Sequence, residues 1–209
     1  MIGIFDSGLG GKFFLEKAQK IFPNEKFILF QDSEFMPYGN KSKEKVFERS
    51  LFAIDFLKSQ GAKKIICACN TASLVLDFFG FNDSCVFSLF ESLKNICVLN
   101  EKKDVSLNIL CTKLTGEFLI NSSTFAFHEI IPLSDLAGII EEKKLTFDYL
   151  KDNLNGLSGV VLLGCTHFSA IKNDLADLNF DFIDVCDVFL SDFKNKGVFL
   201  WENLSLKKL

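Results

Sequence analysis

The chain has 209 residues, which is long enough to bury a sizeable core in one large domain or two small ones. Hydrophobic residues make up 48% of it, yet no apolar run approaches the ~18–20 residues that a membrane-spanning helix needs. The net charge of −4 argues against a non-specific nucleic-acid surface. We therefore expect neither a nucleic acid nor a membrane as a partner.

The seven cysteines are an odd number, and most of them lie within apolar runs. This usage is typical of thiols in a reducing compartment and not of a disulfide framework. Cys67 and Cys69 form a C-x-C pair, but no second cysteine pair or histidine pair stands at zinc spacing, so no metal is expected. Residues 1–6 carry no basic region of a secretory signal, and we expect a cytoplasmic protein.

The first half of the chain alternates apolar runs of strand length with stretches of helical spacing. Strands are expected at 2–5, 26–30 and 65–69, and helices at 13–22, 42–61 and 72–79. Ser42 suits the start of the second helix, and Gly61 suits its end. This β-α-β-α-β-α order predicts a parallel sheet with crossover helices.

A glycine-rich turn, residues 8–11, follows the first strand and invites comparison with phosphate-binding loops. A dinucleotide fingerprint would need glycine where Phe13 stands, and a P-loop would need serine or threonine at the same position. The spacing therefore excludes both. Asp6 remains a candidate, because open α/β sheets place ligand groups at the carboxyl ends of their strands. We expect Asp6 to lie near Cys69, because their strands would be neighbours at the same sheet edge.

The second half repeats this plan without obvious identity, after a stretch at 82–103 that has no clear pattern and is taken as the passage between halves. Further strands are expected at 105–111, 126–131, 159–164 and 180–185, and helices at 134–142, 146–154 and 169–178, before a mostly helical tail at 187–209.

We therefore expect an α/β protein with two similar lobes, each a mainly parallel sheet flanked by helices, and with the active site in the cleft between them. The first lobe is predicted to comprise residues 1–92 plus 187–209. The second lobe is predicted to comprise residues 93–186.

In each half, one strand runs into a cysteine that is followed by a threonine and a helical pattern. These cysteines are Cys69 and Cys165. Equivalent strand ends from two lobes would bring both thiols to one site, so we expect them to be functional. The remaining cysteines are interpreted as buried small hydrophobic residues: Cys67, Cys85, Cys97, Cys111 and Cys186.

Four separated blocks are Phe5-Asp6-Ser7-Gly8 with Gly10-Gly11, Asp32 with Pro37-Tyr38-Gly39, Cys69-Asn70-Thr71-Ala72-Ser73, and Leu163-Gly164-Cys165-Thr166-His167-Phe168. In this order they resemble the glutamate racemase family, cofactor-independent enzymes that make D-glutamate for bacterial peptidoglycan. The resemblance spans residues 1–185, with 81–105 poorly matched. It implies racemisation of L- and D-glutamate without a cofactor, and it makes a homodimer a candidate assembly.

The resemblance also implies roles for individual residues. Cys69 and Cys165 would be the catalytic thiols, assisted by Asp6 and His167. Substrate binding would fall to Asp6, Ser7, Tyr38, Gly39, Asn70, Thr71, Thr112, Thr115, Thr166 and His167. Either Glu141 or Glu142 matches a glutamate that assists catalysis in the family, because two alignments compete there.

Two opposed thiols suit this reaction on chemical grounds. Racemisation removes the α-proton from one face of the substrate and returns a proton to the other, so a single base would have to swing around the carbon. A thiolate is basic, and its pKa of about 8.5 is tuned by its surroundings; a helix start favours the charged form. By the resemblance, Cys69 would act on D-glutamate and Cys165 on L-glutamate.

Three departures from the family pattern concern the scaffold and leave the four blocks intact. Ser169 stands where the family usually has proline, and Cys111 stands where it usually has glycine. The chain is also shorter than usual for the family. We expect these departures to affect the lobe interface, the oligomer contacts or the substrate preference.

Other functions stay open. A related enzyme of the aspartate/glutamate racemase superfamily, such as an aspartate racemase, would keep both cysteines and change the pocket. A catalytically weak paralogue would bind an amino acid or a protein partner. A hydrolase that uses Cys165 as its nucleophile with His167 would leave Cys69 unexplained.

Overall fold

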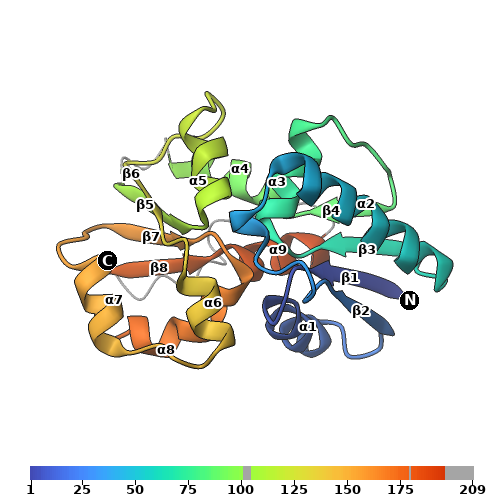
Figure 1. Ribbon diagram of the computed structural model, residues 1–209, viewed down its shortest axis with the longest axis horizontal. Coiled ribbons are helices and arrows are strands. Elements are labelled where there is room, and N and C mark those ends of the chain that lie inside the picture. Colours follow the sequence, from blue (N-terminus) through green and yellow to red (C-terminus); the bar gives the residue numbers. More distant parts are fainter. Residues whose placement is uncertain (101–104, 179, 196–209) are drawn as a thin grey trace.

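The computed structural model describes residues 1–100, 105–178 and 180–195, which form two α/β lobes lying side by side (Figure 1). The first sheet has the strand order β2-β1-β3-β4 and the second has the order β6-β5-β7-β8. All paired strands run parallel. The fold class predicted from the sequence is confirmed.

The first lobe contains β1 (Ile2–Asp6), α1 (Gly10–Ile21), β2 (Phe27–Gln31), the 3₁₀ turn η1 (Tyr38–Asn40), α2 (Lys43–Ser59), β3 (Lys64–Cys67), α3 (Asn70–Phe78) and β4 (Val86–Ser88). The chain continues through α4 (Phe90–Asn100), β5 (Leu107–Cys111), α5 (Lys113–Ile120), β6 (Glu129–Pro132), α6 (Leu136–Glu141), α7 (Phe147–Leu154) and β7 (Val160–Leu163). It ends with the 3₁₀ helix η2 (Thr166–Ile171), α8 (Lys172–Leu175), β8 (Asp181–Asp184) and α9 (Val185–Lys194).

The residues predicted to start and end the second helix, Ser42 and Gly61, have these roles in α2. The Ser42 side chain accepts a hydrogen bond from the Lys45 amide at 3.3 Å and so caps α2. Gly61, just past the end of α2, has a φ of +83°, a conformation that glycine adopts without strain. Every residue of β1 and β5 is buried, as central strands of a parallel sheet covered on both faces should be.

The two sheets share one core. A single cluster of buried side chains includes Ile4 and Ile66 from the first sheet together with Ile109 and Leu162 from the second. Phe14 of α1 contributes to this cluster, with its ring centroid 5.9 Å from that of Phe189 on α9. The lobes are therefore packed against each other, although each has a sheet of its own.

Several predicted boundaries were wrong. The third strand ends at Cys67 and not at residue 69, and the predicted helix at 169–178 is replaced by η2 and the short α8. The stretch without a clear pattern contains β4 and α4 in its described part, residues 82–100. The strand β4 was not predicted, because an edge strand of three half-buried residues is too short to show a period of two. Cys85 is exposed and not buried.

The predicted division into residues 1–92 plus 187–209 and 93–186 stays a prediction. Of the predicted helical tail, α9 is observed up to Lys194, and residues 196–209 lie outside the described residues. None of the helices in the described part of the chain is long and apolar enough to cross a membrane.

Candidate active site

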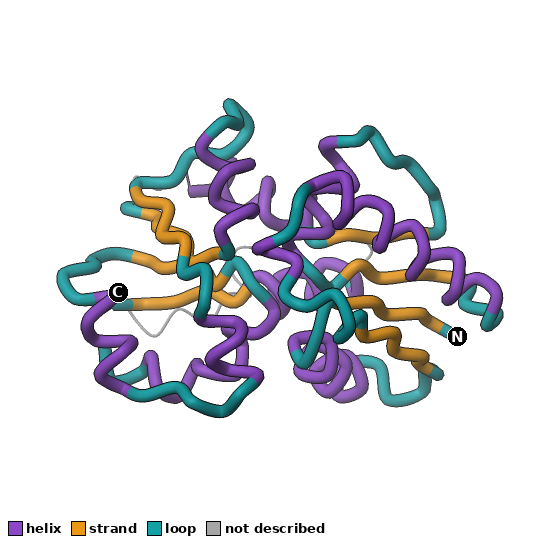
Figure 2. The backbone as a smooth tube through the Cα atoms, in the orientation of Figure 1, coloured by secondary structure: helices purple, strands orange, loops and turns teal. Residues whose placement is uncertain are grey.

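The strands of both sheets run toward the middle of the molecule, where loops and helix starts from the two lobes meet (Figure 2). In the first lobe, β1 and β3 are paired neighbours with Phe5 opposite Cys67. The Ala68 amide donates to the Phe5 carbonyl at 2.9 Å, which extends this pairing past the end of β3. The next residue, Cys69, forms the start of α3 and so lies beside the end of β1.

The first-lobe thiol is buried beside two residues that follow β1. Cys69 is 5% exposed, and its sulfur lies 3.8 Å from the Ser7 hydroxyl. Asp6 is fully buried and near enough for its charge to raise the pKa of Cys69. The neighbourhood of Asp6 and Cys69 that the sequence predicted is therefore observed.

The second-lobe thiol has a different partner. Cys165 is 7% exposed and stands at the start of η2, with its sulfur 3.7 Å from Nδ1 of His167. Nε2 of His167 lies 2.8 Å from Oε1 of Glu141, at the end of α6. Glu142 points elsewhere and pairs with Lys144 at 2.6 Å. Of the two glutamates proposed from the sequence, Glu141 is the one that reaches the site.

Hydrogen bonds across the lobe boundary join these two halves. The Thr166 hydroxyl donates to Oδ2 of Asp6 at 2.9 Å, while the Gly8 amide donates to Oδ1 at 2.9 Å. The Leu9 amide donates to Oε1 of Glu141 at 2.6 Å. Each acidic side chain thus contacts both lobes, and the site is complete only when the lobes are together.

The glycine-rich turn owes its composition to this close approach. A Cβ atom on Gly10 would collide with the Thr166 side chain, and one on Gly8 would collide with Oε1 of Glu141. Since any side chain here would force the lobes apart, the glycines are explained by lobe packing and not by a phosphate.

Three threonines from both lobes form a triangle of hydroxyl groups. Thr71 Oγ1 lies 3.0 Å from those of Thr112 and Thr115, which are themselves 3.0 Å apart. The Thr112 hydroxyl also caps α5 by accepting a hydrogen bond from the Thr115 amide at 3.4 Å. A Cβ atom on Gly39 would collide with Thr112, so this part of η1 packs directly on the triangle.

The Tyr38 hydroxyl is bound to the ion pair of Asp32 and Arg49. It donates to Oδ2 of Asp32 at 2.6 Å, and Arg49 binds both oxygens of the same carboxylate at 2.8 and 2.6 Å. Substrate binding by Tyr38 stays a prediction; the ring packs in the same core cluster as Cys69. The sequence analysis missed Arg49, although it is the sole arginine of the chain and stands in a predicted helix, which is a usable signal.

Asn70 has a buried donor that lacks a partner. Its side chain is 4% exposed, and Nδ2 makes no hydrogen bond within the described residues. A buried amide left unpaired costs about 1–3 kcal/mol. Its place next to Cys69, at the start of α3, makes an anionic oxygen a fitting acceptor.

Burial and partners shift the titration of the site. Burial, with a further contribution from Asp6 and Cys165, raises the pKa of Cys69 to about 12, which outweighs the helix start expected to favour the thiolate. Burial also raises the pKa of Asp6. Burial would lower the pKa of His167, but Cys165 and Glu141 raise it to about 10. These shifts favour the protonated form of His167 and the neutral thiol of Cys69.

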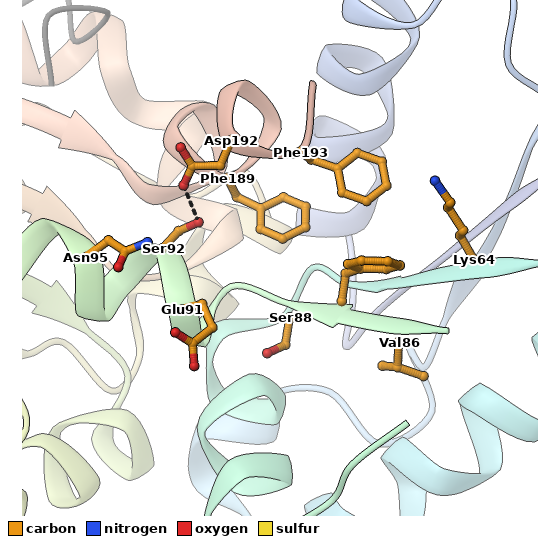
Figure 3. A pocket seen from close by; sticks show the side chains of 10 residues that line it. Lys64, Val86, Ser88, Glu91, Ser92, Asn95, Phe189, Asp192 and Phe193 are labelled. Carbon is orange, nitrogen blue, oxygen red and sulfur yellow. Dashed lines mark hydrogen bonds between the residues drawn. The ribbon is translucent and has the colours of Figure 1, made fainter. Parts of the chain in front are cut away.

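Two of the pockets differ in their relation to the site residues. One of about 350 Å³ opens beside the threonine triangle, between Gly39 of the first lobe and Lys113 of the second. Another, of about 640 Å³, lies where β4, α4 and α9 meet (Figure 3). Phe189 and Phe193 line it, together with the hydrogen-bonded pair Ser92 and Asp192, and it contains none of the predicted site residues.

Metal ligation is a separate question. The described residues contain no group of three or more His, Cys, Asp or Glu side chains that could hold a metal ion. The acidic and thiol groups of the site are instead occupied by the hydrogen bonds given above.

Comparison with known proteins adds an independent line of evidence. No protein-family model matches the chain. A glutamate racemase of Clostridium perfringens is 34% identical over 203 residues, which cover 89% of this chain and 77% of the relative. Glutamate racemase 2 of Bacillus subtilis is 33% identical over 194 residues, covering 85% and 73%. The crystal structure of the Campylobacter jejuni glutamate racemase superposes with a TM-score of 0.82 at 22% identity, covering 97% of this chain and 88% of that one.

Proposed function

This chain belongs to the glutamate racemase family, and we propose on that premise that it interconverts L- and D-glutamate by passing the α-proton between two cysteines. The carrying observation is the pair of buried thiols, Cys69 and Cys165, delivered by equivalent strand ends of two lobes. No cofactor is invoked in this proposal.

The proposed step on L-glutamate begins at Cys165. Its thiolate, held beside cationic His167, takes the α-proton, and the electron pair left on the carbon is stabilised by the substrate carboxylate. Cys69, a neutral thiol with a pKa of about 12, then delivers a proton to the opposite face. The two thiols end with their protonation exchanged, so the balance of protons is kept.

The reverse step, on D-glutamate, needs Cys69 as the base. Asp6 is the carboxylate beside it, and the proposed role of Asp6 is to relay the proton that Cys69 must lose. Thr166 holds one oxygen of Asp6 and the Gly8 amide holds the other, which fixes the carboxylate against movement.

Polar groups around the thiols are proposed to bind the substrate. The unpaired amide of Asn70 and the hydroxyl of Ser7 serve the α-carboxylate near Cys69. The threonine triangle serves the second carboxylate, with Gly39 packed against it. Because the thiols are only 5% and 7% exposed, substrate entry requires the lobes to separate.

The proposed setting follows from the product and the thiols. D-glutamate would serve peptidoglycan synthesis, as in the resemblance given above. The free thiols of Cys67, Cys69, Cys85, Cys111, Cys165 and Cys186 support the cytoplasm as the place of the reaction. We keep a homodimer as the proposed assembly, supported by the exposed Phe52 and Phe78, which lie on α2 and α3 and are 51% and 52% exposed.

Exchange of the α-proton tests the function directly. The purified chain is incubated with L- or D-glutamate in D₂O without added cofactor, and α-deuteration and optical rotation are followed. We expect both enantiomers to interconvert, with the activity lost in Cys69→Ser and in Cys165→Ser. Exchange of aspartate alone would keep the mechanism and change the substrate. If the folded chain exchanges the α-proton of no amino acid, the proposed enzymatic function is refuted and a binding protein remains as the alternative.

A further inference from the structure

A network of charged groups joins the two lobes away from the proposed thiols. Lys17 of α1 forms ion pairs with Asp184, at the end of β8, and with Asp187 at 2.7 Å. Its ammonium group also donates to the Ser169 hydroxyl at 3.3 Å. Ser169 in turn donates to Oδ2 of Asp184 at 2.6 Å. One side chain of the first lobe thus holds η2 and the end of β8 together.

The geometry of η2 links this network to the site. Side chains three residues apart on a 3₁₀ helix eclipse each other, so Thr166 and Ser169 lie on one side of η2. That side faces α1, because Gly10 packs on Thr166 and Lys17 binds Ser169. Gly10 and Lys17 are separated by about 10 Å along α1. The helical turn that follows Cys165 is therefore fixed to α1 at two points.

We propose that Lys17 is a positioning residue, which acts through Ser169 and Asp184 to hold η2, and with it Thr166 and His167, against the first lobe. This inference rests on the proposed function. Thr166 must reach Asp6 and His167 must reach Glu141, and both contacts depend on where η2 lies. Without Lys17, η2 would lose the contact of Ser169 with α1 and keep the packing of Thr166 on Gly10 and the Thr166 hydrogen bond to Asp6.

The Ser169 hydroxyl is the link between the lysine and the carboxylate. It accepts a hydrogen bond from Lys17 and donates one to Asp184. Through this one hydroxyl group, η2 is bound both to α1 of the first lobe and to the end of β8.

The buried carboxylate of Asp184 is kept in its charged form by two lysines. The Asp184 side chain is 1% exposed, and burial would raise its pKa, but Lys17 and Lys172 lower it. Lys172 stays 2.9 Å from Asp184. A variant without Lys17 therefore leaves the carboxylate paired, so we expect it to fold.

Kinetics with matched variants provide the first test. Lys17→Met should lower kcat by about tenfold to a hundredfold, with a smaller change in KM, because misplaced catalytic groups slow the chemical step. Ser169→Ala, which keeps every charge, should also lower kcat. The kcat of the double variant should match that of Lys17→Met within about threefold, because both residues act in one network. Lys17→Arg should restore most of the rate. Lys20→Met, on the exposed side of the same helix, should behave as the native chain.

Thiol alkylation provides a test that does not depend on turnover. The rates at which iodoacetamide modifies Cys69 and Cys165 are compared with the rate at exposed Cys85 in the same chain by mass spectrometry. Lys17→Met and Ser169→Ala should raise the ratio for Cys165 at least about threefold, because η2 moves more freely.

The outcomes separate this inference from the proposed function. If the native chain racemises glutamate but both variants keep its kcat and alkylation ratios, the role of Lys17 is refuted and the function stands. If the native chain racemises nothing, the function fails, and the alkylation ratio still decides on Lys17. A fall in thermal stability with native kcat and ratios would also refute a positioning role.

Discussion

Cys69 and Cys165 take the same place in their lobes, because β3 and β7 are each the third strand of a sheet with the order 2-1-3-4. Their surroundings differ. In register, Asp6 at the end of β1 corresponds to Cys111 at the end of β5, since Phe5 pairs with Cys67 and Leu110 with Leu163. The second lobe therefore has no carboxylate where the first lobe has Asp6.

The missing carboxylate is replaced from another element. Glu141 reaches the second site from the end of α6, and His167 stands between it and the thiol of Cys165. The first thiol thus has a buried carboxylate nearby, whereas the second has an imidazole supported by a carboxylate. A repeated fold supplies the two thiols, and non-equivalent residues supply their proton partners.

The largest expected effect on kcat comes from replacing the proton partner of either thiol, Asp6 for Cys69 or His167 for Cys165. Asp6→Asn and His167→Asn should each lower kcat by about 10²–10⁴-fold, because a positioned acid or base contributes that much to proton transfer. Polarimetry with both enantiomers measures the effect. An unchanged rate in either variant would show that the corresponding thiol works without the partner assigned to it. Circular dichroism of each variant controls for folding.

A smaller effect is expected at the carboxylate that supports the imidazole. Glu141→Gln keeps an oxygen for the Leu9 amide and removes the charge beside His167, so kcat should fall about tenfold. Glu142→Gln is the matched control, because Glu142 is exposed and pairs with Lys144. Equal activity of the two variants would contradict the role given to Glu141.

The comparison also predicts how stability depends on pH. The pKa of His167 is about 10 in the folded chain, above its ordinary value, so its protonation stabilises the fold. This contribution is fully present below the ordinary histidine pKa of about 6.5 and is lost as the pH rises through about 10. The free energy of unfolding should fall by about 1–2 kcal/mol between about pH 6.5 and 8.5. Urea denaturation measures it, and His167→Asn should flatten this slope.

Contacts that follow from the order of strands and helices could be predicted from the sequence, whereas contacts that depend on the exact position of one side chain could not. Asp6 and Cys69 were placed together because their strands are neighbours in a β-α-β sheet, which follows from the order of elements alone. Glu141 and Glu142 were not separated, because adjacent residues of a helix differ in direction by about 100° and an error of one residue exchanges them. The contact of Lys17 with Ser169 joins residues 152 apart, and neither belongs to a motif.

The smallest expected effect concerns the hydroxyl group beside Cys69. Ser7 Oγ lies 3.8 Å from the Cys69 sulfur, a weak contact, and it lowers the pKa of that thiol only against the larger effects of burial and Asp6. Ser7→Ala should therefore reduce kcat by less than about threefold, since the carboxylate stays in place. Progress curves at saturating D-glutamate measure the change. A loss as large as that of Asp6→Asn would move the proton relay from the carboxylate to the hydroxyl group, and the two thiols would then differ in a way that the strand register does not explain.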